Sequence, residues 1–477
     1  MTESPPARHV ILILADQHAR YASGAYGSEV VETPNIDRLA EEGTTFESAY
    51  CASPMCVPSR AAIMTGRFVH EIGAWDNAHP YHGSPPGWAH ALRDAGVTTA
   101  VVGKMHFRSP DDDTGFEEMM LPMDVADGVG DLYSLVRDDM PARPALADLV
   151  RRAGPGKSPY HAYDRAVAKR ACGWLRSASV EDRWALTVSF ATPHHPLLAP
   201  QEYWDLYEDP QLPPEWEGPD HEHPYPAELR RVMGVDVPFA EEEIRRARRA
   251  YFALCTLADS LIGDVIAQAR ACGFDRDTLI IYSSDHGCSL GERGLWWKHH
   301  LYEESVGVPL IVVGPGFQSG RRVQEPASQT SLYSTVLEAL GVVAPEREHR
   351  SPSLANIAVH GEQGLLGGFA EYHGLGASSG AFMLRVGALK YVYYASQPPQ
   401  LFDLHRDPDE LVDLVADPAF DADVKRLDAQ LKSLIDPGRI DQEARADQED
   451  LIRRHGGREA ILQLGFNIPF TPVPRGD

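Results

Sequence analysis

The chain has 477 residues, 43% of them hydrophobic, and a formal net charge of −25 at pH 7. This length allows one large domain with a smaller one, or two to three modest domains, and the acidic balance argues against nucleic acids and anionic membranes as partners. Because no apolar run is long enough to span a bilayer, the first residues lack a signal-peptide layout and the six cysteines are scattered, we expect a cytoplasmic protein without disulfides.

Apolar strands alternate with helices along the chain, which indicates α/β layering. In chain order the sequence predicts a strand over 9–16, helices over 34–43, 56–66 and 88–96, strands over 98–104 and 184–196, a long helix over 241–272, and strands over 278–287 and 308–316. An antiparallel hairpin is predicted over 381–394. We therefore expect an N-terminal α/β catalytic domain over 1–367, with a large mixed, mostly parallel sheet between helices. A small C-terminal α+β domain over 368–477 would hold an antiparallel sheet.

The most informative segment is AYCASPMCVPSRAAIMTGR, residues 49–67. Pro58 is placed for the first turn of a helix and Gly66 for its end, so Cys56 lies at or just before a helix N-terminus. Free backbone N–H groups favour bound anions there. One helical turn later, Arg60 adds a positively charged guanidinium with forked hydrogen-bond donors. A buried structural cysteine or a Cys51–Cys56 disulfide remain open on this pattern alone.

Residues 56–60, CVPSR, resemble the Cys-x-Pro-Ser-Arg signature of the sulfatase family, within the alkaline-phosphatase-like superfamily. The resemblance implies an alkaline-phosphatase-like fold and the oxidation of Cys56 to formylglycine by a maturation enzyme. Chemistry favours such an aldehyde: its hydrate carries two hydroxyls on one carbon. One hydroxyl can attack sulfur, and the other can then lose its proton and expel sulfate, whereas serine or cysteine would retain a stable ester.

Polar residues follow two of the predicted strands, Asp16 after the first and Asp285 with His286 after the strand that begins at residue 278. Ligand sites in open α/β sheets lie beyond the carboxyl ends of strands. The resemblance implies that these three residues and the modified Cys56 bind one divalent metal. Gln17 stands where many relatives have a second Asp, and His286 where many have Asn; Gln17 still offers a carbonyl oxygen. We expect Ca²⁺ on family grounds, with Mn²⁺ as the alternative because His favours borderline metals.

Further runs resemble the family's basic residues: GKMHF, ATPHHPLLAP and GERGLWWKHHLYEESVGVPLIV. They place Lys104, His106, His194 and Lys298 in the site. With Arg60 and the metal, the two lysines would stabilise negative charge on the transferring sulfuryl group. His194 with Lys298 would protonate the leaving alcohol, and His106 would accept the proton of the second hydroxyl; the two histidines are interchangeable in this assignment.

The expected activity is hydrolysis of small-molecule sulfate monoesters to alcohol and inorganic sulfate. Two runs resemble choline sulfatases, GAWDNAHPY, in which Asn77 would face the sulfate, and AEYHG, in which Glu371 would face the substrate. The alternatives are a phosphonate monoester hydrolase or phosphodiesterase of the same superfamily and an unmodified, non-catalytic binding protein. The former tend to carry Tyr and Thr where this chain has Lys104 and His106. The tail after Asp441 lies outside the resemblance, and its segment 461–474 is a candidate arm for a homo-oligomer.

Overall fold

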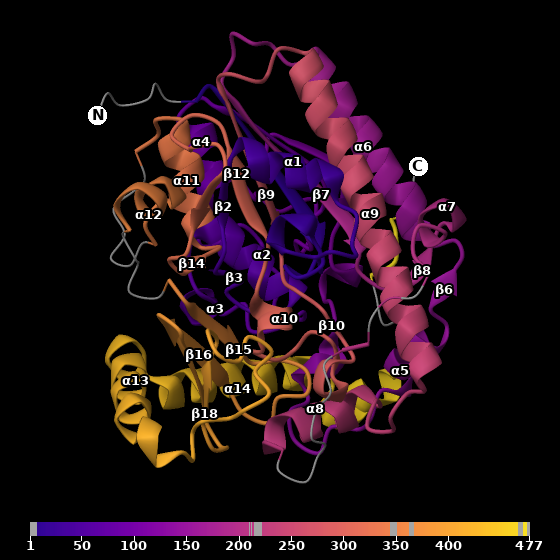
Figure 1. Ribbon diagram of the computed structural model, residues 1–477, viewed down its shortest axis with the longest axis vertical. Coiled ribbons are helices and arrows are strands. Elements are labelled where there is room, and N and C mark those ends of the chain that lie inside the picture. Colours follow the sequence, from indigo (N-terminus) through magenta and orange to yellow (C-terminus); the bar gives the residue numbers. More distant parts are fainter. Residues whose placement is uncertain are drawn as a thin grey trace.

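The fold was analysed in a computed structural model, which describes residues 7–208, 210, 212–213, 222–343, 351–361, 367–465 and 471–474. A central sheet of eight strands runs through the larger part of the molecule (Figure 1). Its strands are, in spatial order, β13 (Arg321–Val323), β2 (Thr44–Phe46), β12 (Leu310–Val313), β9 (Thr278–Ser284), β1 (His9–Asp16), β7 (Trp184–Pro193), β4 (Thr98–Lys104) and β5 (Glu118–Met123).

Strand β1 lies in the middle of the sheet, so every one of its eight residues is buried. It pairs in parallel with β7 and β9, and β4 pairs in parallel with β7 and β5. Only β12 runs antiparallel to its neighbours β9 and β2 among the described pairs. The predicted mixed, mostly parallel sheet is therefore confirmed. The predicted strand over 184–196 ends earlier, at Pro193, and the one over 278–287 ends at Ser284.

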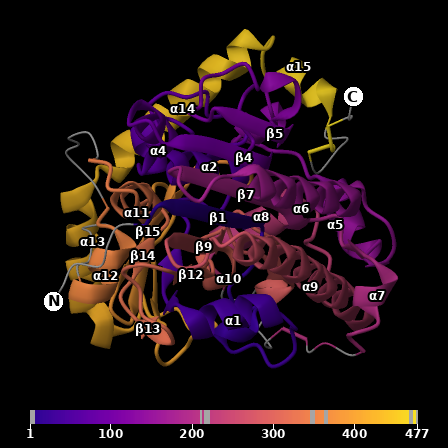
Figure 2. The ribbon, with the colours of Figure 1, turned by 90° about the horizontal axis from the view of Figure 1, so that it is seen from above.

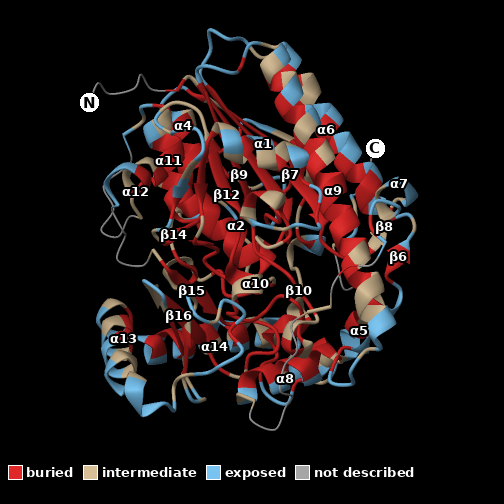
Figure 3. Ribbon diagram, viewed as in Figure 1, coloured by how far each residue is buried: buried red, intermediate tan, exposed pale blue. Residues whose placement is uncertain are grey.

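Helices cover both faces of this sheet (Figure 2). One face packs against α1 (Pro34–Glu42), α6 (Pro159–Ser177) and α9 (Glu241–Ala271), and the other against α2 (Cys56–Thr65), α4 (Trp88–Asp94) and α11 (Ser331–Ala339). Figure 3 shows the buried residues concentrated in the sheet and on the inner sides of these helices. By length and apolar composition α9 could cross a membrane, but 78% of its apolar window is buried inside the protein, as in a core helix.

A second sheet lies at the other end of the molecule and is antiparallel throughout (Figure 1). It begins at Phe369, one residue after the predicted boundary; the division into two domains stays a prediction. Its strands and flanking helices are β15 (Phe369–Tyr372), β16 (Ala381–Val386), β17 (Leu389–Tyr394), β18 (Gln400–Asp403), α13 (Asp421–Leu434), α14 (Pro437–Arg454) and α15 (Arg458–Leu464).

Short elements lie between the larger ones along the chain. They are β3 (Ala49–Tyr50), α3 (Val69–Ile72), α5 (Pro144–Arg151), β6 (Gly154–Pro155), β8 (Leu198–Ala199), α7 (Gln201–Trp204), α8 (Pro224–Met233), β10 (Ser289–Leu290), β11 (Trp296–Trp297), α10 (Glu303–Val306), β14 (Ala327–Ser328) and α12 (Leu354–His360), with 3-10 turns that include η3 (Leu132–Leu135).

Candidate active site

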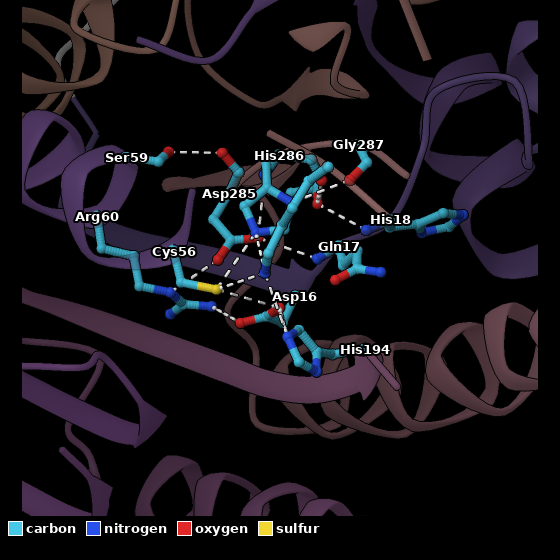
Figure 4. A network of polar contacts seen from close by, with 12 residues as sticks. Asp16, Gln17, His18, Cys56, Ser59, Arg60, His194, Asp285, His286 and Gly287 are labelled. Atoms are coloured by element: carbon cyan, nitrogen blue, oxygen red, sulfur yellow. Dashed lines mark hydrogen bonds and ion pairs between the residues drawn. The ribbon is translucent and has the colours of Figure 1, made fainter. Parts of the chain in front are cut away.

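Four buried side chains meet at the carboxyl ends of β1 and β9 (Figure 4). Asp16 is the last residue of β1, Asp285 and His286 follow β9 directly, and Cys56 is the first residue of α2. Their ligand atoms all lie within 4.8 Å of one another, and none of the four is more than 2% exposed. The structure thus brings together four of the five residues that the resemblance assigned to a metal.

Two cations balance the carboxylates of this cluster. Arg60 Nη2 lies 2.9 Å from Asp16 Oδ2 and Arg60 Nε lies 2.9 Å from Asp285 Oδ2, while Lys104 Nζ lies 2.8 Å from Asp16 Oδ2. Burial alone would raise the pKa of Asp16, but the cations Lys104 and Arg60 hold that pKa well below its usual range. Asp16 is therefore ionised at neutral pH and able to bind a cation.

Cys56 lies in the first turn of α2, where backbone N–H groups are free of helical partners. Its Sγ is 2.9 Å from Lys298 Nζ and 3.3 Å from His286 Nε2. Burial and the charge of Asp16 raise the pKa of the Cys56 thiol, against the opposing effect of Lys298. As a plain thiol the residue would be protonated at neutral pH and a weak nucleophile.

The donor set fits a divalent cation. His286 Nδ1 donates to the carbonyl oxygen of Gly287 at 2.9 Å, which leaves Nε2 facing the cluster. Burial lowers the pKa of His286 to about 4, so Nε2 is unprotonated at neutral pH and accepts from Lys298 Nζ at 3.0 Å. Gln17 Oε1 is buried and has no hydrogen-bond partner among the described residues, while its Nε2 donates to Cys288 Sγ. Gln17 therefore retains the carbonyl oxygen that the sequence offered as a ligand. That these residues bind a metal, and which ion, stay predictions.

Lys104 and His106 enter the site from the end of β4. Gly103 has φ 104°, and a Cβ at this position would lie 2.0 Å from the carbonyl oxygen of Ser189 on β7. Only glycine allows this close approach, which explains why a glycine precedes Lys104. Burial, Lys104 and Arg60 hold the pKa of His106 well below its usual range, so its imidazole is neutral.

Lys298 and His194 form a hydrogen-bonded pair beside Cys56. The distance from Lys298 Nζ to His194 Nε2 is 3.2 Å, and His194 Nδ1 donates to the carbonyl oxygen of His195 at 2.8 Å. Burial would lower the pKa of Lys298, but Cys56 and Asp16 raise it; burial, His195 and Lys298 hold the pKa of His194 well below its usual range. The pair therefore carries its proton on the ammonium.

A cavity of about 380 Å³ adjoins this cluster. Five predicted site residues line it, namely Cys56, Asn77, His106, His194 and Lys298. Asn77 Oδ1 accepts a hydrogen bond from the backbone N–H of Val57, in the first turn of α2. The structure places this residue beside the nucleophile segment, and its contact with sulfate stays a prediction.

Glu371 does not reach this cavity. Its carboxylate lies 2.8 Å from His70 Nδ1 on α3 and 2.9 Å from His373 Nε2, and its side chain is fully buried. Glu371 is absent from the described residues that line the cavity. The contact with substrate that the sequence suggested therefore has no support in the geometry, because both oxygens of Glu371 are engaged by histidines.

Sequence reasoning missed much of the cavity wall. The missed residues include Asp131, Tyr133, Arg143, Leu146, Trp297, His299, Leu375, Ile461, Leu464, Thr471 and Pro472. It also missed Ser59 Oγ, which donates to the carbonyl oxygen of Asp285, and Gln329, whose Oε1 accepts from Ser59. The wall residues come from loops, short elements and α15 and share no common motif, whereas Ser59 stands within CVPSR.

The C-terminal tail lies across the cavity of its own chain. Residues 471–474 and α15 are described, whereas 466–470, part of the predicted oligomer arm, lie outside the described residues. Thr471 and Pro472 line the cavity together with Ile461 and Leu464. An arm between copies stays a prediction, and the described tail residues serve the site of the same chain.

A mostly parallel sheet with paired carboxylates at its strand ends and a nucleophile position at a helix start defines an alkaline-phosphatase-like hydrolase. The family model described as Sulfatase matches residues 8–342, and the model described as N-sulphoglucosamine sulphohydrolase, C-terminal, matches 291–436. The chain belongs to the sulfatase family. It is therefore a sulfuric ester hydrolase, and the alternative of a non-catalytic binding protein is set aside.

Two curated relatives are similar over most of the chain. The Choline-sulfatase of Rhizobium meliloti is 34% identical over 445 residues, which cover 90% of this chain and 86% of the relative. The Arylsulfatase K of Danio rerio is 30% identical over 453 residues, which cover 90% and 84%.

Among solved structures, the phosphonate monoester hydrolase of Agrobacterium radiobacter superposes with a TM-score of 0.72 at 22% identity, covering 90% of this chain and 95% of the other. This likeness shows the shared fold.

Proposed function

We propose that the protein hydrolyses sulfate monoesters through a formylglycine made from Cys56, with one divalent metal held by Asp16, Gln17, Asp285 and His286. The observation that carries the proposal is the juxtaposition of Cys56 with two carboxylates, a neutral histidine and the ammonium of Lys298 in one buried cluster. The metal would supply a positive charge against the sulfate oxygens. The hydrated aldehyde would supply two hydroxyls, one to attack sulfur and one to release sulfate.

Lys298 and His194 are placed to deliver the proton that the departing alcohol needs. Lys298 Nζ lies 2.9 Å from Cys56 Sγ and 3.2 Å from His194 Nε2, so it stands between the nucleophile position and the histidine. The carboxylate of Asp16 favours the charged form of Lys298, so the side chain can donate its proton as an ammonium. Neutral His106, which also lines the cavity, is available to accept a proton at the release step.

Arg60 acts on the reaction through the carboxylates. Its guanidinium donates to Asp16, to Asp285, to the Ser189 hydroxyl and to the carbonyl oxygen of Lys104. These four contacts leave it fixed beneath the cluster, so we assign to Arg60 the orientation of Asp16 and Asp285. The metal and Lys298 would instead stabilise the negative charge on the sulfuryl group.

The cavity favours a neutral alcohol over a quaternary ammonium. Among its described lining residues Asp131 is the one acid away from the cluster, and its Oδ2 lies 3.1 Å from Arg143 Nη1. Arg143 is buried and its guanidinium lies over the Tyr133 ring, 4.3 Å from the centroid. A carboxylate and an aromatic face already engaged by arginine offer little to a choline cation. Aryl or sugar sulfates suit the mixed apolar and polar wall better.

The decisive experiment compares kcat/KM across aryl, sugar and choline sulfates, phosphate diesters and phosphonate monoesters. We expect a sulfate monoester to be the best substrate, because Lys104 and His106 stand where the phosphonate enzymes tend to have Tyr and Thr. A preference for phosphodiesters by orders of magnitude would replace the proposal with the alternative activity. Intact mass tests the nucleophile independently, since the peptide with Cys56 should lose about 18 Da on conversion from thiol to aldehyde.

A further inference from the structure

The C-terminal tail is anchored to the segment that carries Asn77. On α14, Gln448 Nε2 donates to Asp76 Oδ2 at 2.8 Å, and Asp447 Oδ2 accepts from Trp75 Nε1 at 2.8 Å. On α15, Ile461 is fully buried in a small apolar cluster with Ala78, Leu135 and Val136. These contacts bring the described end of the chain to the cavity.

Thr471 connects the tail to two residues next to the catalytic cluster, His106 and Tyr160. Its Oγ1 lies 2.9 Å from His106 Nε2, and its carbonyl oxygen accepts from the hydroxyl of Tyr160 at 2.7 Å. Tyr160 is itself 1% exposed, and its ring lies 5.9 Å from Lys104 Nζ and 6.3 Å from the His194 ring. The threonine is therefore held on one side by a buried tyrosine and contacts a predicted catalytic histidine on the other.

We infer that Thr471 is a positioning residue for His106 and that the tail closes the wall of the cavity on the alcohol side. His106 Nδ1 is buried without a hydrogen-bond partner among the described residues, so the contact at Nε2 fixes the orientation of the imidazole. His106 has φ 55°, so its backbone fixes the direction in which the side chain leaves the chain. The contact with Thr471 fixes the orientation of the imidazole at its far end. This inference rests on the proposed function in so far as His106 acts in turnover.

The test compares Thr471→Val, which keeps the shape but removes the hydroxyl, with Thr471→Ser, which keeps the hydroxyl. We expect Thr471→Val to lower kcat for an aryl sulfate about tenfold, the worth of one hydrogen bond, with KM nearly unchanged. Thr471→Ser should retain kcat within about twofold. The exposed Pro474→Ala variant is the matched control and should behave as the parent. Equal kcat in the Val variant, or equal losses in Val and Ser, would overturn the inference.

A second measurement separates this inference from the proposed function. Diethyl pyrocarbonate modifies accessible, unbonded imidazoles, and peptide mass spectrometry reports the rate at His106. We expect Thr471→Val and a chain ending at Gly465 to be modified at His106 several times faster than the parent, whether or not the protein turns over sulfate esters. Unchanged labelling would refute the positioning role. Faster labelling of the variants than of the parent, together with a parent that lacks sulfatase activity, would support the positioning role and refute the proposed function.

Discussion

The two ends of the cavity are built in different ways. The reaction end comes from strand ends and the first turn of α2, and its charged groups are buried and paired. The alcohol end comes from segments far apart in the chain: the η3–α5 region, His299, Leu375 and the tail. The reaction end is therefore held by the central sheet, whereas the alcohol end depends on how loops and the tail pack. Substitutions at the first should change chemistry. Substitutions at the second should change the choice of substrate, except at Thr471, which acts on His106.

The largest effect is expected at the nucleophile. Cys56→Ala should lower kcat by at least about 1,000-fold, because no other group at the helix start can attack sulfur. The fold should persist, since the substitution removes one sulfur atom, and circular dichroism with thermal unfolding checks this. Cys172→Ala, at a partly exposed position distant in sequence, is the control. Near-normal turnover by the Cys56 variant would break the distinction between the two ends.

Metal removal should have the next largest effect and should also be confined to the reaction end. A chelator should abolish activity and lower the melting temperature, since unbound Asp16 and Asp285 lose a stabilising cation. Ca²⁺ or Mn²⁺ should restore both. His286→Asn replaces a nitrogen ligand by oxygen and should shift the preferred ion towards Ca²⁺. Full activity after exhaustive chelation would count against the metal site.

A smaller and selective effect is expected at the alcohol end. Asp131→Asn and Arg143→Met disrupt the ion pair in the cavity wall. We expect KM values to change by up to about tenfold and the ranking of sulfate esters to alter, while kcat for a small aryl sulfate stays within about twofold. Steady-state kinetics on the substrate panel measures this, and Asp148→Asn, on the exposed side of α5, is the control. Uniform loss of kcat on every substrate would show that the two ends are not separable.

The smallest effect on turnover is expected between the two sheets, where Glu371 joins His70 to His373. Burial would raise the pKa of Glu371, but His70 and His373 lower it to about 2; burial would lower the pKa of His70, but Glu371 raises it. The Glu371 contribution to stability is present above its unfolded pKa of about 4.5 and is lost as pH falls towards 2. The His70 contribution is present below 6.5 and is lost as pH rises through its raised pKa.

Glu371→Gln should therefore destabilise the protein by roughly 2 kcal/mol, most strongly between about pH 4.5 and 6.5. Urea unfolding at several pH values measures this, with the exposed Glu443→Gln on α14 as control. Kinetics should change little, because Glu371 lies outside the cavity. A large rise in KM for choline sulfate alone would restore the substrate contact that the sequence suggested.

What could be predicted from the sequence also differs between the reaction end and the alcohol end. Three segments could be predicted because each is an apolar run bounded by polar or turn-forming residues: the strand before Asp16, the strand before Asp285 and the helix from Cys56. It could therefore also be predicted that their ends meet. Asp131 and Thr471 could not, because no local pattern tells which loop or tail lies over a strand end. The contact of Glu371 with substrate stays a prediction. Its run resembles choline sulfatases in sequence, but the buried histidines His70 and His373 determine where its carboxylate points.

The burial of Cys56 bears on when the protein can mature. At 2% exposure, under Lys298 and within the first turn of a packed helix, its sulfur is out of reach of any second enzyme once the chain has folded. If oxidation to the aldehyde occurs, we expect it on the nascent chain, before the C-terminal half, which supplies Lys298 and His286, has been translated and docked. A host cell that folds this chain faster than it oxidises it would accumulate a soluble, well-packed and permanently inert protein.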